Sequence, residues 1–319
     1  MTGRLAQRSS NATQDAMYDA IVVGAGPAGL LAAVYLARFR RSVAVIDAGQ
    51  SRVALIPRSH NYPGFGDGVS GLTVLDMLRA QLGHYAVDRL GAFVEGAERR
   101  EDGFHLQTRT GALAARQLLL ATGVTDIPPA MPHVREALEA GVLRYCPVCD
   151  AYEVIDKAVG VYADGEAGVG EALYLRHFSA DITLFMAPGG QVLTQAQRRR
   201  LAEAGIRWNE APVHAVRREG VRVAAVHEGG TAWCDTLYCA LGVAVHSQIA
   251  QGLGATLDGT GYVQVDAHHA TDVPGLYAAG DVSAGLNQIA VALGGAAIAA
   301  SAMHRALPMG TPGTPIASR

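Results

Sequence analysis

Residues 18–39 read YDAIVVGAGPAGLLAAVYLARF, and this stretch decides the fold. Tyr18–Val23 is a short apolar run typical of a buried strand, and Leu30–Phe39 has the apolar pattern of a helix. A second apolar run, SVAVID, follows and ends on Asp47. The order strand, glycine-rich turn, helix and strand predicts a parallel nucleotide-binding α/β unit.

The turn between the first strand and the helix has the pattern G-x-G-x-x-G. Gly24 allows a tight turn, Gly26 lets the backbone approach a pyrophosphate, and Gly29 lets the helix pack on the strand. The helix N-terminus then faces the phosphates, and Asp47 can accept a hydrogen bond from a ribose hydroxyl. Because all these parts occur together, we expect a dinucleotide site and not a merely structural turn.

A second unit of the same kind starts at Ala158, in AVGVYADGEAGVGEALYLRHFSADITLF. Its pattern predicts a strand at Val159–Tyr162, a helix at Val169–Phe178 and a strand at Asp181–Phe185. The chain therefore contains a weak internal repeat of two nucleotide-type units.

Composition narrows the class of protein. A chain of 319 residues, half of them apolar and 17% charged, is large enough for two domains and unlike a disordered chain. A net charge of -3 gives no reason to expect nucleic acid or an anionic membrane as partner. The polar N-terminus lacks the apolar segment of a signal peptide, and the apolar stretch 286–303 suits a packed helix. We expect a soluble cytoplasmic protein.

Cys146 and Cys149 form a C-x-x-C pair in RYCPVCDAYEV, which allows three interpretations. A zinc site needs two more ligands, and Cys234 and Cys239 would lie on opposite faces of one regular strand. Two buried thiols without chemistry are a second possibility. Redox use is favoured, because this spacing commonly lowers the pKa of a thiol. We expect no metal, and we interpret Cys234 and Cys239 as structural.

From about Tyr18 to Leu307 the chain resembles the low-molecular-weight thioredoxin reductases and their relatives among flavin disulfide oxidoreductases. The resemblance is carried by the first glycine motif, NYPGF (61–65), ATG (121–123), CPVCD (146–150), TDVPGLYAAGD (271–281) and a C-terminal helix containing Gln288.

The resemblance implies an α/β fold of two Rossmann-like, three-layer nucleotide-binding domains, the second inserted into the first. The expected boundaries are 17–123 with 243–308 for an FAD-binding domain, 124–242 for the inserted unit, and flexible tails at 1–16 and 309–319. The implied FAD-binding residues are Gly24, Gly26, Pro27, Ala28, Gly29, Asp47, Asn61, Ala121, Thr122, Gly123, Gly280, Asp281, Asn287, Gln288 and Ile289.

The resemblance also implies roles at the cysteine pair. Cys149 would exchange electrons with the flavin, and Cys146 would react with the substrate sulfur. Asp150 would move a proton to or from a thiol, which requires a pKa raised by burial. Helix N-capping is the alternative for Asp150, and also for Asp281, which the resemblance places at the ribityl chain.

The second glycine turn departs from the reductases, which bind NADPH there through a glycine motif and a basic cluster. The turn reads Ala163–Gly168 here, and Asp164 puts a carboxylate where a diphosphate should approach. The segment after the next strand, MAPGG, has no basic residue. Arg198–Arg200 come later, and three consecutive helical residues point in different directions. We therefore interpret the unit as a scaffold that has lost or weakened nicotinamide binding.

A loop before NYPGF departs as well. The reductases have Gly-Gly-Gln-Leu shortly after the second strand, whereas this chain has QSRVALIPRSHNYPGF. Arg58, His60 and Asn61 lie in this loop and could approach the flavin or substrate, although a surface loop is equally compatible.

These patterns leave several functions open. One is an FAD-dependent dithiol oxidase that passes electrons to oxygen, although many of those have histidine where this chain has Asp150. Another is a reductase fed by an iron–sulfur protein or another donor. An NADPH-dependent thioredoxin reductase with an altered site, and a non-enzymatic FAD-binding regulatory protein, are the alternatives. The expected partners are a small dithiol or disulfide, or a thioredoxin-like protein, and a second copy in a homodimer.

Overall fold

The computed structural model describes residues 17–309, so the predicted tails lie outside the described residues except for Met309. The strands are β1 (Tyr18–Val23), β2 (Val43–Asp47), β3 (Asp88–Gly91), β4 (Val94–Arg100), β5 (Gly103–Thr108), β6 (Gly111–Leu120), β7 (Val124–Asp126), β8 (Leu143–Arg144), β9 (Val159–Ala163), β10 (Ile182–Met186), β11 (Arg207–Asn209), β12 (Val213–Glu219), β13 (Arg222–His227), β14 (Gly230–Cys234), β15 (Thr236–Ala240), β16 (Val243–Val245) and β17 (Leu276–Ala278). The helices are α1 (Pro27–Arg38), η1 (Arg52–Leu55), α2 (Gly71–Leu82), α3 (Val134–Glu139), α4 (Pro147–Asp150), η2 (Ala151–Val154), α5 (Gly165–Leu175), α6 (Gln195–Glu203), α7 (Gln248–Gly252) and α8 (Ile289–Ala306).

The first lobe is built on a seven-stranded sheet. Its strand order is β3-β2-β1-β6-β5-β4, and β17 pairs with the C-terminal half of β6. The β3-β2-β1-β6 portion and β17 are parallel, whereas β4, β5 and β6 form an antiparallel meander. Residues from both ends of the chain therefore share one sheet.

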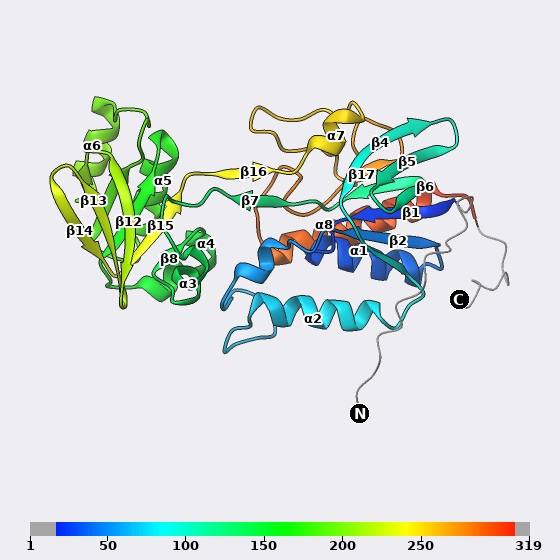
Figure 1. The fold of residues 1–319 in the computed structure, drawn as a ribbon, viewed down its shortest axis with the longest axis horizontal. Helices are drawn as coiled ribbons and strands as arrows, with labels where there is room; N and C mark the ends of the chain where they lie inside the picture. The colour runs from blue at the N-terminus through cyan, green and yellow to red at the C-terminus, as the bar shows by residue number, and fades with distance from the viewer. Residues whose placement is uncertain (1–16, 310–319) are drawn as a thin grey trace.

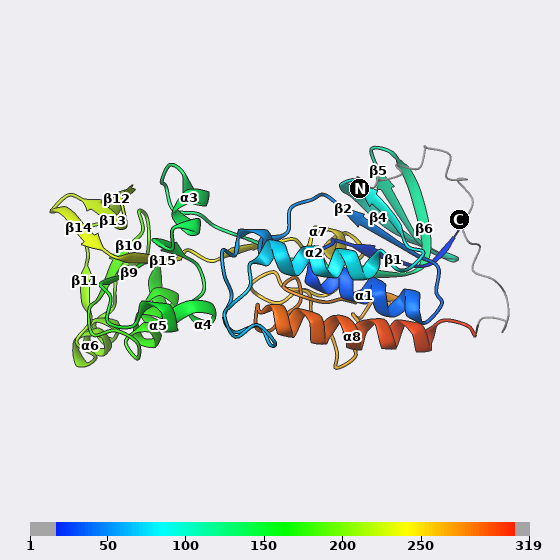
Figure 2. The ribbon, with the colours of Figure 1, turned by 90° about the horizontal axis from the view of Figure 1, so that it is seen from below.

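Both faces of this sheet are covered, which gives three layers. Alternate residues of β1 point to opposite sides, as a strand requires. Ala20 and Val22 pack with α1, α2 and α8, whereas Ile21 and Val23 pack with the meander, α7 and the segment before β17. Figure 2 shows the three helices stacked on one side of the sheet.

The inserted lobe repeats this design on a smaller scale. Its five parallel strands have the order β11-β10-β9-β15-β8, and an antiparallel sheet β12-β13-β14 lies beside them. One buried cluster joins the parallel sheet to α5 and α6, and another joins it to α3 and the three-stranded sheet. The predicted fold class, two Rossmann-like units with one inserted into the other, is confirmed.

Two short strands connect the lobes. β7 and β16 pair antiparallel, with Val243 opposite Asp126, and form a ribbon between the lobes (Figure 1). The predicted change of domain at 123–124 and 242–243 falls at the ends of this ribbon.

Among residues 17–309, one helix is long and apolar enough to cross a membrane by length and composition. This is α8, and 33% of its apolar window is buried inside the structure. Its small residues Ala292, Ala296, Ala299 and Ala300 belong to the core of the first lobe, where α8 packs along α1.

Candidate active site

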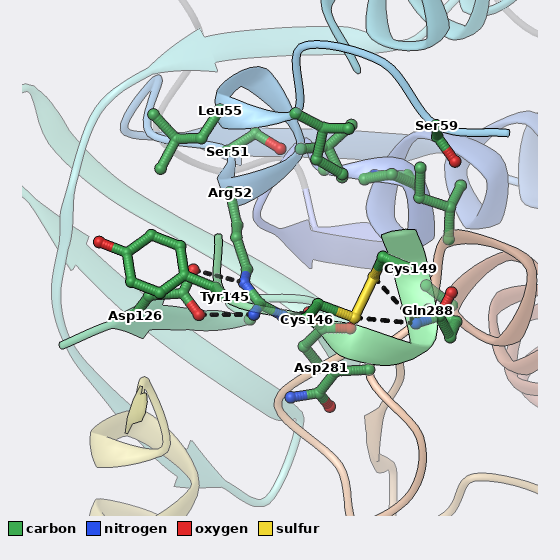
Figure 3. A pocket seen from close by; sticks show the side chains of 18 of the residues that line it. Ser51, Arg52, Leu55, Ser59, Asp126, Tyr145, Cys146, Cys149, Asp281 and Gln288 are labelled. Carbon is green, nitrogen blue, oxygen red and sulfur yellow. Dashed lines mark hydrogen bonds and ion pairs between the residues drawn. A yellow bond between two sulfur atoms is a disulfide. The ribbon is translucent and has the colours of Figure 1, made fainter. Parts of the chain in front are cut away.

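A cavity of about 390 Å³ lies where the two lobes meet (Figure 3). It brings together every residue predicted for FAD or catalysis except one. The lining residues among those predicted are Gly24, Gly26, Pro27, Ala28, Asp47, Asn61, Ala121, Thr122, Gly123, Cys146, Cys149, Asp150, Gly280, Asp281, Asn287, Gln288 and Ile289. The exception is Gly29, where a Cβ would lie 1.9 Å from the carbonyl oxygen of Gly24, so this glycine serves helix packing.

The first glycine turn has the shape that a pyrophosphate needs. Gly24 has a φ of +103°, and a Cβ there would lie 2.3 Å from the Ala121 carbonyl oxygen. Gly26 is the N-cap of α1 and has no side chain to cap it, so the first N–H groups of α1 are open to an anion. Asp47 accepts a hydrogen bond from the Ala25 N–H at 3.1 Å through one carboxylate oxygen. The open N–H groups at α1 and the carboxylate of Asp47 are compatible with the predicted FAD site.

A charged cluster lies deeper in the cavity. Arg52 donates from Nε and Nη2 to the two carboxylate oxygens of Asp126, at 2.8 and 2.5 Å, and from Nη1 to Asp281 at 3.1 Å. Burial alone would lower the pKa of Arg52, but the carboxylates of Asp126 and Asp281 raise it above its ordinary value. Burial raises the pKa of the Asp281 carboxyl, and Arg52 opposes that rise. Asp281 is thus a cavity residue, and the N-cap of the following helix α8 is Gln288 instead.

The cysteine pair enters the cavity from the inserted lobe. Cys146 and Cys149 form a disulfide at the start of α4, with Pro147 in the first turn of the helix. Pro147 suits this position because its missing N–H would have no helical partner there. Cys146 is the N-cap, and its carbonyl accepts from the Cys149 N–H at 3.0 Å.

Residues of the first lobe contact the disulfide directly. Gln288 donates from Nε2 to both sulfurs, at 3.2 Å to Cys149 and 3.4 Å to Cys146 (Figure 3). Asn61 donates to the Gln288 side-chain oxygen at 2.9 Å and to the Val148 carbonyl at 3.4 Å. The sequence predicted Asn61 and Gln288 as flavin residues, and in this structure their contacts are to the cysteine loop.

Asp150 lies at the end of α4 and lines the cavity. Its carboxylate oxygens bond to Arg144 at 2.5 Å and to the Tyr238 hydroxyl at 2.8 Å, and neither bonds to a sulfur within the described residues. Burial raises the pKa of Asp150, and Arg144 and Tyr238 reduce that rise. Its side chain caps no helix, so the N-cap alternative finds no support.

The other two cysteines lie outside the site. The expectation that they share one strand is wrong, because Cys234 ends β14 and Cys239 lies in β15, with Asp235 turning the chain between the two strands. Both are buried, and burial raises the pKa of each thiol to about 12. Within residues 17–309 no cluster of metal-ligating side chains is present.

The second glycine turn is closed by its own aspartate. Asp164 precedes α5, and its carboxylate accepts a hydrogen bond from the Gln191 N–H at 2.6 Å. Gln191 belongs to the loop after β10, and its side chain lies against Gly165. The loop after β10 is therefore tied to the turn where a diphosphate would need open backbone N–H groups.

The three arginines of α6 have carboxylate partners. Arg198 pairs with Glu210 and Arg199 with Glu203. Arg200 pairs with Glu166 on α5, beside the glycine turn. As predicted from their consecutive positions, the three side chains do not converge on one site.

The sequence did not single out Arg52 or Asp126. Arg52 lies in the loop QSRVALIPRSH, whose departure from the reductases was the available signal, but the residues predicted from that loop to approach the flavin or substrate were Arg58, His60 and Asn61. Both of those also line the cavity, with His60 Nε2 3.9 Å from a Glu153 oxygen and Arg58 bonded to the Asp67 carbonyl.

Comparison with known proteins extends over both lobes. The family model of the pyridine nucleotide-disulphide oxidoreductases matches residues 18–296. Thioredoxin reductase of Treponema pallidum is 31% identical, covering 89% of this chain and 95% of that protein. The crystal structure of HlmI gives a TM-score of 0.84 at 29% identity, covering 92% of this chain and 93% of the other.

Two reductase structures differ in how well they superpose. Thioredoxin reductase from Streptococcus pyogenes gives a TM-score of 0.83 at 26% identity, covering 91% of this chain and 98% of that one. Thioredoxin reductase from T. acidophilum gives a TM-score of 0.59 at 27% identity, covering 90% of this chain and 98% of that one.

Proposed function

We propose that this chain, which belongs to the pyridine nucleotide-disulphide oxidoreductase family and is an FAD-dependent disulfide oxidoreductase of the thioredoxin reductase type, works without a nicotinamide coenzyme. It passes electrons between the flavin and a substrate dithiol or disulfide through Cys146 and Cys149. The substrate is a small molecule or a thioredoxin-like protein.

The observation that carries the proposal is the Asp164–Gln191 hydrogen bond across the second glycine turn. A dinucleotide there would have to displace this bond and place its diphosphate against the Asp164 carboxylate, and like charges at close range repel. Arg200, which reaches α5 from α6, is already paired with Glu166. The inserted lobe then serves to carry the cysteine pair.

In the oxidising direction, a substrate thiolate attacks the Cys146 sulfur and breaks the Cys146–Cys149 bond, which leaves Cys149 as a thiolate. The second substrate thiol, once deprotonated, attacks the substrate sulfur in this mixed disulfide. The substrate leaves as a disulfide and Cys146 leaves as a thiolate, so two electrons now reside on the reduced pair. FAD, held by the first glycine turn, would supply the acceptor for those two electrons, so that the Cys146–Cys149 bond reforms.

The remaining side chains have proposed supporting roles. Asp150 takes up or returns the thiol proton, which its raised pKa suits. The first glycine turn and Asp47 would hold the adenosine diphosphate part of FAD, and Asp281, Ala121–Gly123 and Asn287–Ile289 would line its remaining part, since all of them line the cavity.

Two directions fit this path. As a dithiol oxidase, the enzyme returns the electrons of reduced FAD to oxygen as hydrogen peroxide. As a reductase, an iron–sulfur protein or another donor feeds the flavin, and the same steps run in reverse. Oxygen consumption with a model dithiol, with one peroxide formed per dithiol oxidised, would select the oxidase, and its absence the reductase.

The test of the electron path compares wild type with a Cys146→Ser, Cys149→Ser double variant. Both are mixed anaerobically with a dithiol while flavin absorbance is recorded. We expect wild-type flavin to bleach, and the variant to stay oxidised with its FAD content unchanged. Equal bleaching in both proteins would overturn the role of the pair.

An NADPH-dependent thioredoxin reductase is the second candidate. It is favoured by the near-complete coverage of relatives named thioredoxin reductase, such as the Treponema pallidum protein. Reduction of the flavin by NADPH separates the two candidates.

A further inference from the structure

A chain of hydrogen bonds leads from the buried Ser59 of the first lobe to the disulfide. The Ser59 hydroxyl donates to the Asn61 side-chain oxygen at 2.9 Å, and the Asn61 amide donates to the Gln288 side-chain oxygen at 2.9 Å. The Gln288 amide then donates to the sulfurs of Cys149 and Cys146. Ser59 and Asn61 lie in one loop of the first lobe and Gln288 lies at the start of α8, and the last contact crosses from the first lobe to the inserted lobe.

An acceptor-only partner fixes how the two amides are turned. The Val148 carbonyl can only accept, so the Asn61 group 3.4 Å from it is the NH₂ group, which also faces the Gln288 oxygen. The Gln288 oxygen is then occupied, so its NH₂ group must face the sulfurs. A reversed Gln288 would bring two NH₂ groups together and put an oxygen lone pair against sulfur.

Gln288 has no other structural duty that explains this position. It is the N-cap residue of α8, where a side chain commonly accepts from the first helical N–H groups. Its side chain makes no such bond and extends to the cysteine pair instead. The start of α8 therefore positions an uncharged hydrogen-bond donor, the Gln288 amide, against the sulfurs of Cys146 and Cys149.

We propose that the Gln288 amide stabilises the thiolate of the reduced pair, chiefly on Cys149, and that Ser59 and Asn61 are positioning residues that hold its NH₂ group toward sulfur. The inference deepens the proposed function and rests on it, because it assigns a donor to the sulfur that leaves when substrate attacks Cys146. A hydrogen bond to a charged acceptor is stronger than one to a neutral acceptor, so the donor favours thiolate over thiol.

Other groups around the pair also influence its titration. The inserted lobe contributes Arg144, Tyr145, Asp150 and Glu153, and the first lobe contributes Arg52, His60 and Asp281. All of them are left intact in the variants below. A change in the apparent pKa of Cys146 or Cys149 is therefore due to the altered Gln288 or Asn61 side chain.

The first experiment measures the pH dependence of alkylation. Holoprotein is reduced anaerobically with a phosphine and treated with iodoacetamide across a pH series, and mass spectrometry reads Cys146 and Cys149 separately. The test variant is Gln288→Met, which keeps the length of the side chain and removes the donor. The control is Gln248→Met, because Gln248 is exposed on α7 and its amide contacts only the Val245 carbonyl.

Loss of one hydrogen bond to a thiolate is expected to raise the apparent pKa of Cys149 by about one to two units, a loss of roughly ten- to a hundredfold in thiolate at fixed pH. The control should titrate like wild type. A Gln288→Met profile within about 0.3 units of wild type for both cysteines would overturn the inference.

The second variant, Asn61→Leu, tests the positioning role. Leucine has the shape of asparagine but cannot hold the Gln288 oxygen, so the amide is free to turn, and we expect a smaller upward shift at Cys149. In the Gln288→Met background the same change should add nothing, because there is no amide left to orient. A full additional shift in the double variant would refute the relay through Gln288.

These outcomes are separable from failure of the proposed function. If the cysteine double variant still allowed dithiols to bleach the flavin, the electron path would fail while the alkylation shift of Gln288→Met could still be present. The pH of half-maximal long-wavelength thiolate–flavin absorbance gives a second, independent measure of the same thiolate.

Discussion

Asp150 follows the cysteine pair directly, and its surroundings favour the protonated form. Burial raises the pKa of its carboxyl, while Arg144 and Tyr238 hold it in place and partly offset the rise. A carboxyl group with a raised pKa can exchange a proton with a thiol at a pH where an ordinary aspartate stays ionised. The residue suits the proton transfer that disulfide exchange requires, once it reaches the sulfur in the reduced state.

Asp150 predicts a specific pH dependence. In the dithiol-to-flavin direction Asp150 is the base, so the rate of flavin reduction falls as the pH drops through its raised pKa. Asp150→Asn should lower the rate by about a hundredfold or more and remove this limb. The hydrogen bond from Tyr238 stabilises the ionised carboxylate of Asp150 and so lowers its pKa. Tyr238→Phe removes this bond, so the fall in rate should occur at higher pH. Stopped-flow measurements over a pH series would check both, and a limb that moved to lower pH in Tyr238→Phe would contradict the assignment.

Cys234 and Cys239 are expected to be unreactive in the folded protein. Both are buried, and burial raises the pKa of each thiol to about 12, so almost no thiolate exists at neutral pH. Iodoacetamide should label Cys146 and Cys149 after reduction and leave these two unlabelled until the protein is denatured. Mass spectrometry reads the result, and rapid native labelling of Cys239 would show that the structural assignment is wrong.

Among single residues, the sequence predicted those that belong to a motif and missed those that matter because they contact residues distant in the sequence. The glycine turn, Asp47 and the cysteine pair follow from spacing alone, and all line the cavity or support its turn. Arg52 and Asp126 are distant in the sequence and belong to no recognised pattern, so only the folded chain shows that they meet. The alkylation experiment on Gln288 addresses another contact of this kind.

Among the elements, η1 joins the two lobes. Val53 and Ala54 pack on the core of the first lobe, whereas Leu55 packs on a core cluster of the inserted lobe. Arg52 binds Asp126 at the end of β7, the strand that leads into the inserted lobe. One short helical turn therefore ties the connecting ribbon to the first lobe in the arrangement that brings the disulfide to the cavity.

The Arg52–Asp126 pair is expected to contribute strongly to this arrangement. The Asp126 side chain is only 8% exposed, and removing it leaves the partly buried Arg52 charge with Asp281 as its remaining carboxylate partner. Asp126→Ala should destabilise the protein by about 3 kcal/mol and loosen the lobes. Thermal unfolding and small-angle X-ray scattering measure the two effects.

The matched control for that variant is Glu95→Ala, which removes the partner of Arg109 in an exposed pair of the first lobe. Its effect should not exceed about 1 kcal/mol, since exposed pairs contribute little. If Asp126→Ala had the same unfolding free energy and scattering profile as Glu95→Ala, the Arg52–Asp126 pair would not hold the lobes together.

The elements of both glycine units were largely predictable. β1 begins and ends where expected, and the second unit has its strand, helix and strand in the expected order. α1 starts at Pro27, earlier than the apolar pattern indicates, because the turn glycines and proline form its first turn. α4 was missed, since a single turn that begins at Pro147 has no periodic signal.

At the scale of the whole molecule, the resemblance predicted the inserted topology, and the paired sheets bear it out. The relative placement of the lobes follows from contacts such as Gln288 to sulfur and Arg52 to Asp126, which no local pattern encodes. The homodimer, the location in the cell and the absence of membrane and nucleic-acid partners stay predictions. For the dimer, Val291 and Ile298 on α8 are exposed apolar residues that a second copy could cover.

The central claim has two parts. The cysteine pair and FAD exchange electrons with a thiol substrate, and the inserted lobe does not bind a nicotinamide coenzyme as an electron donor. The most direct measurement is anaerobic mixing of the oxidised holoprotein with excess NADPH or NADH, followed by addition of a dithiol, with flavin absorbance recorded throughout. We predict that the flavin stays oxidised with either nucleotide and bleaches when the dithiol is added. Rapid bleaching by NADPH or NADH would contradict the account.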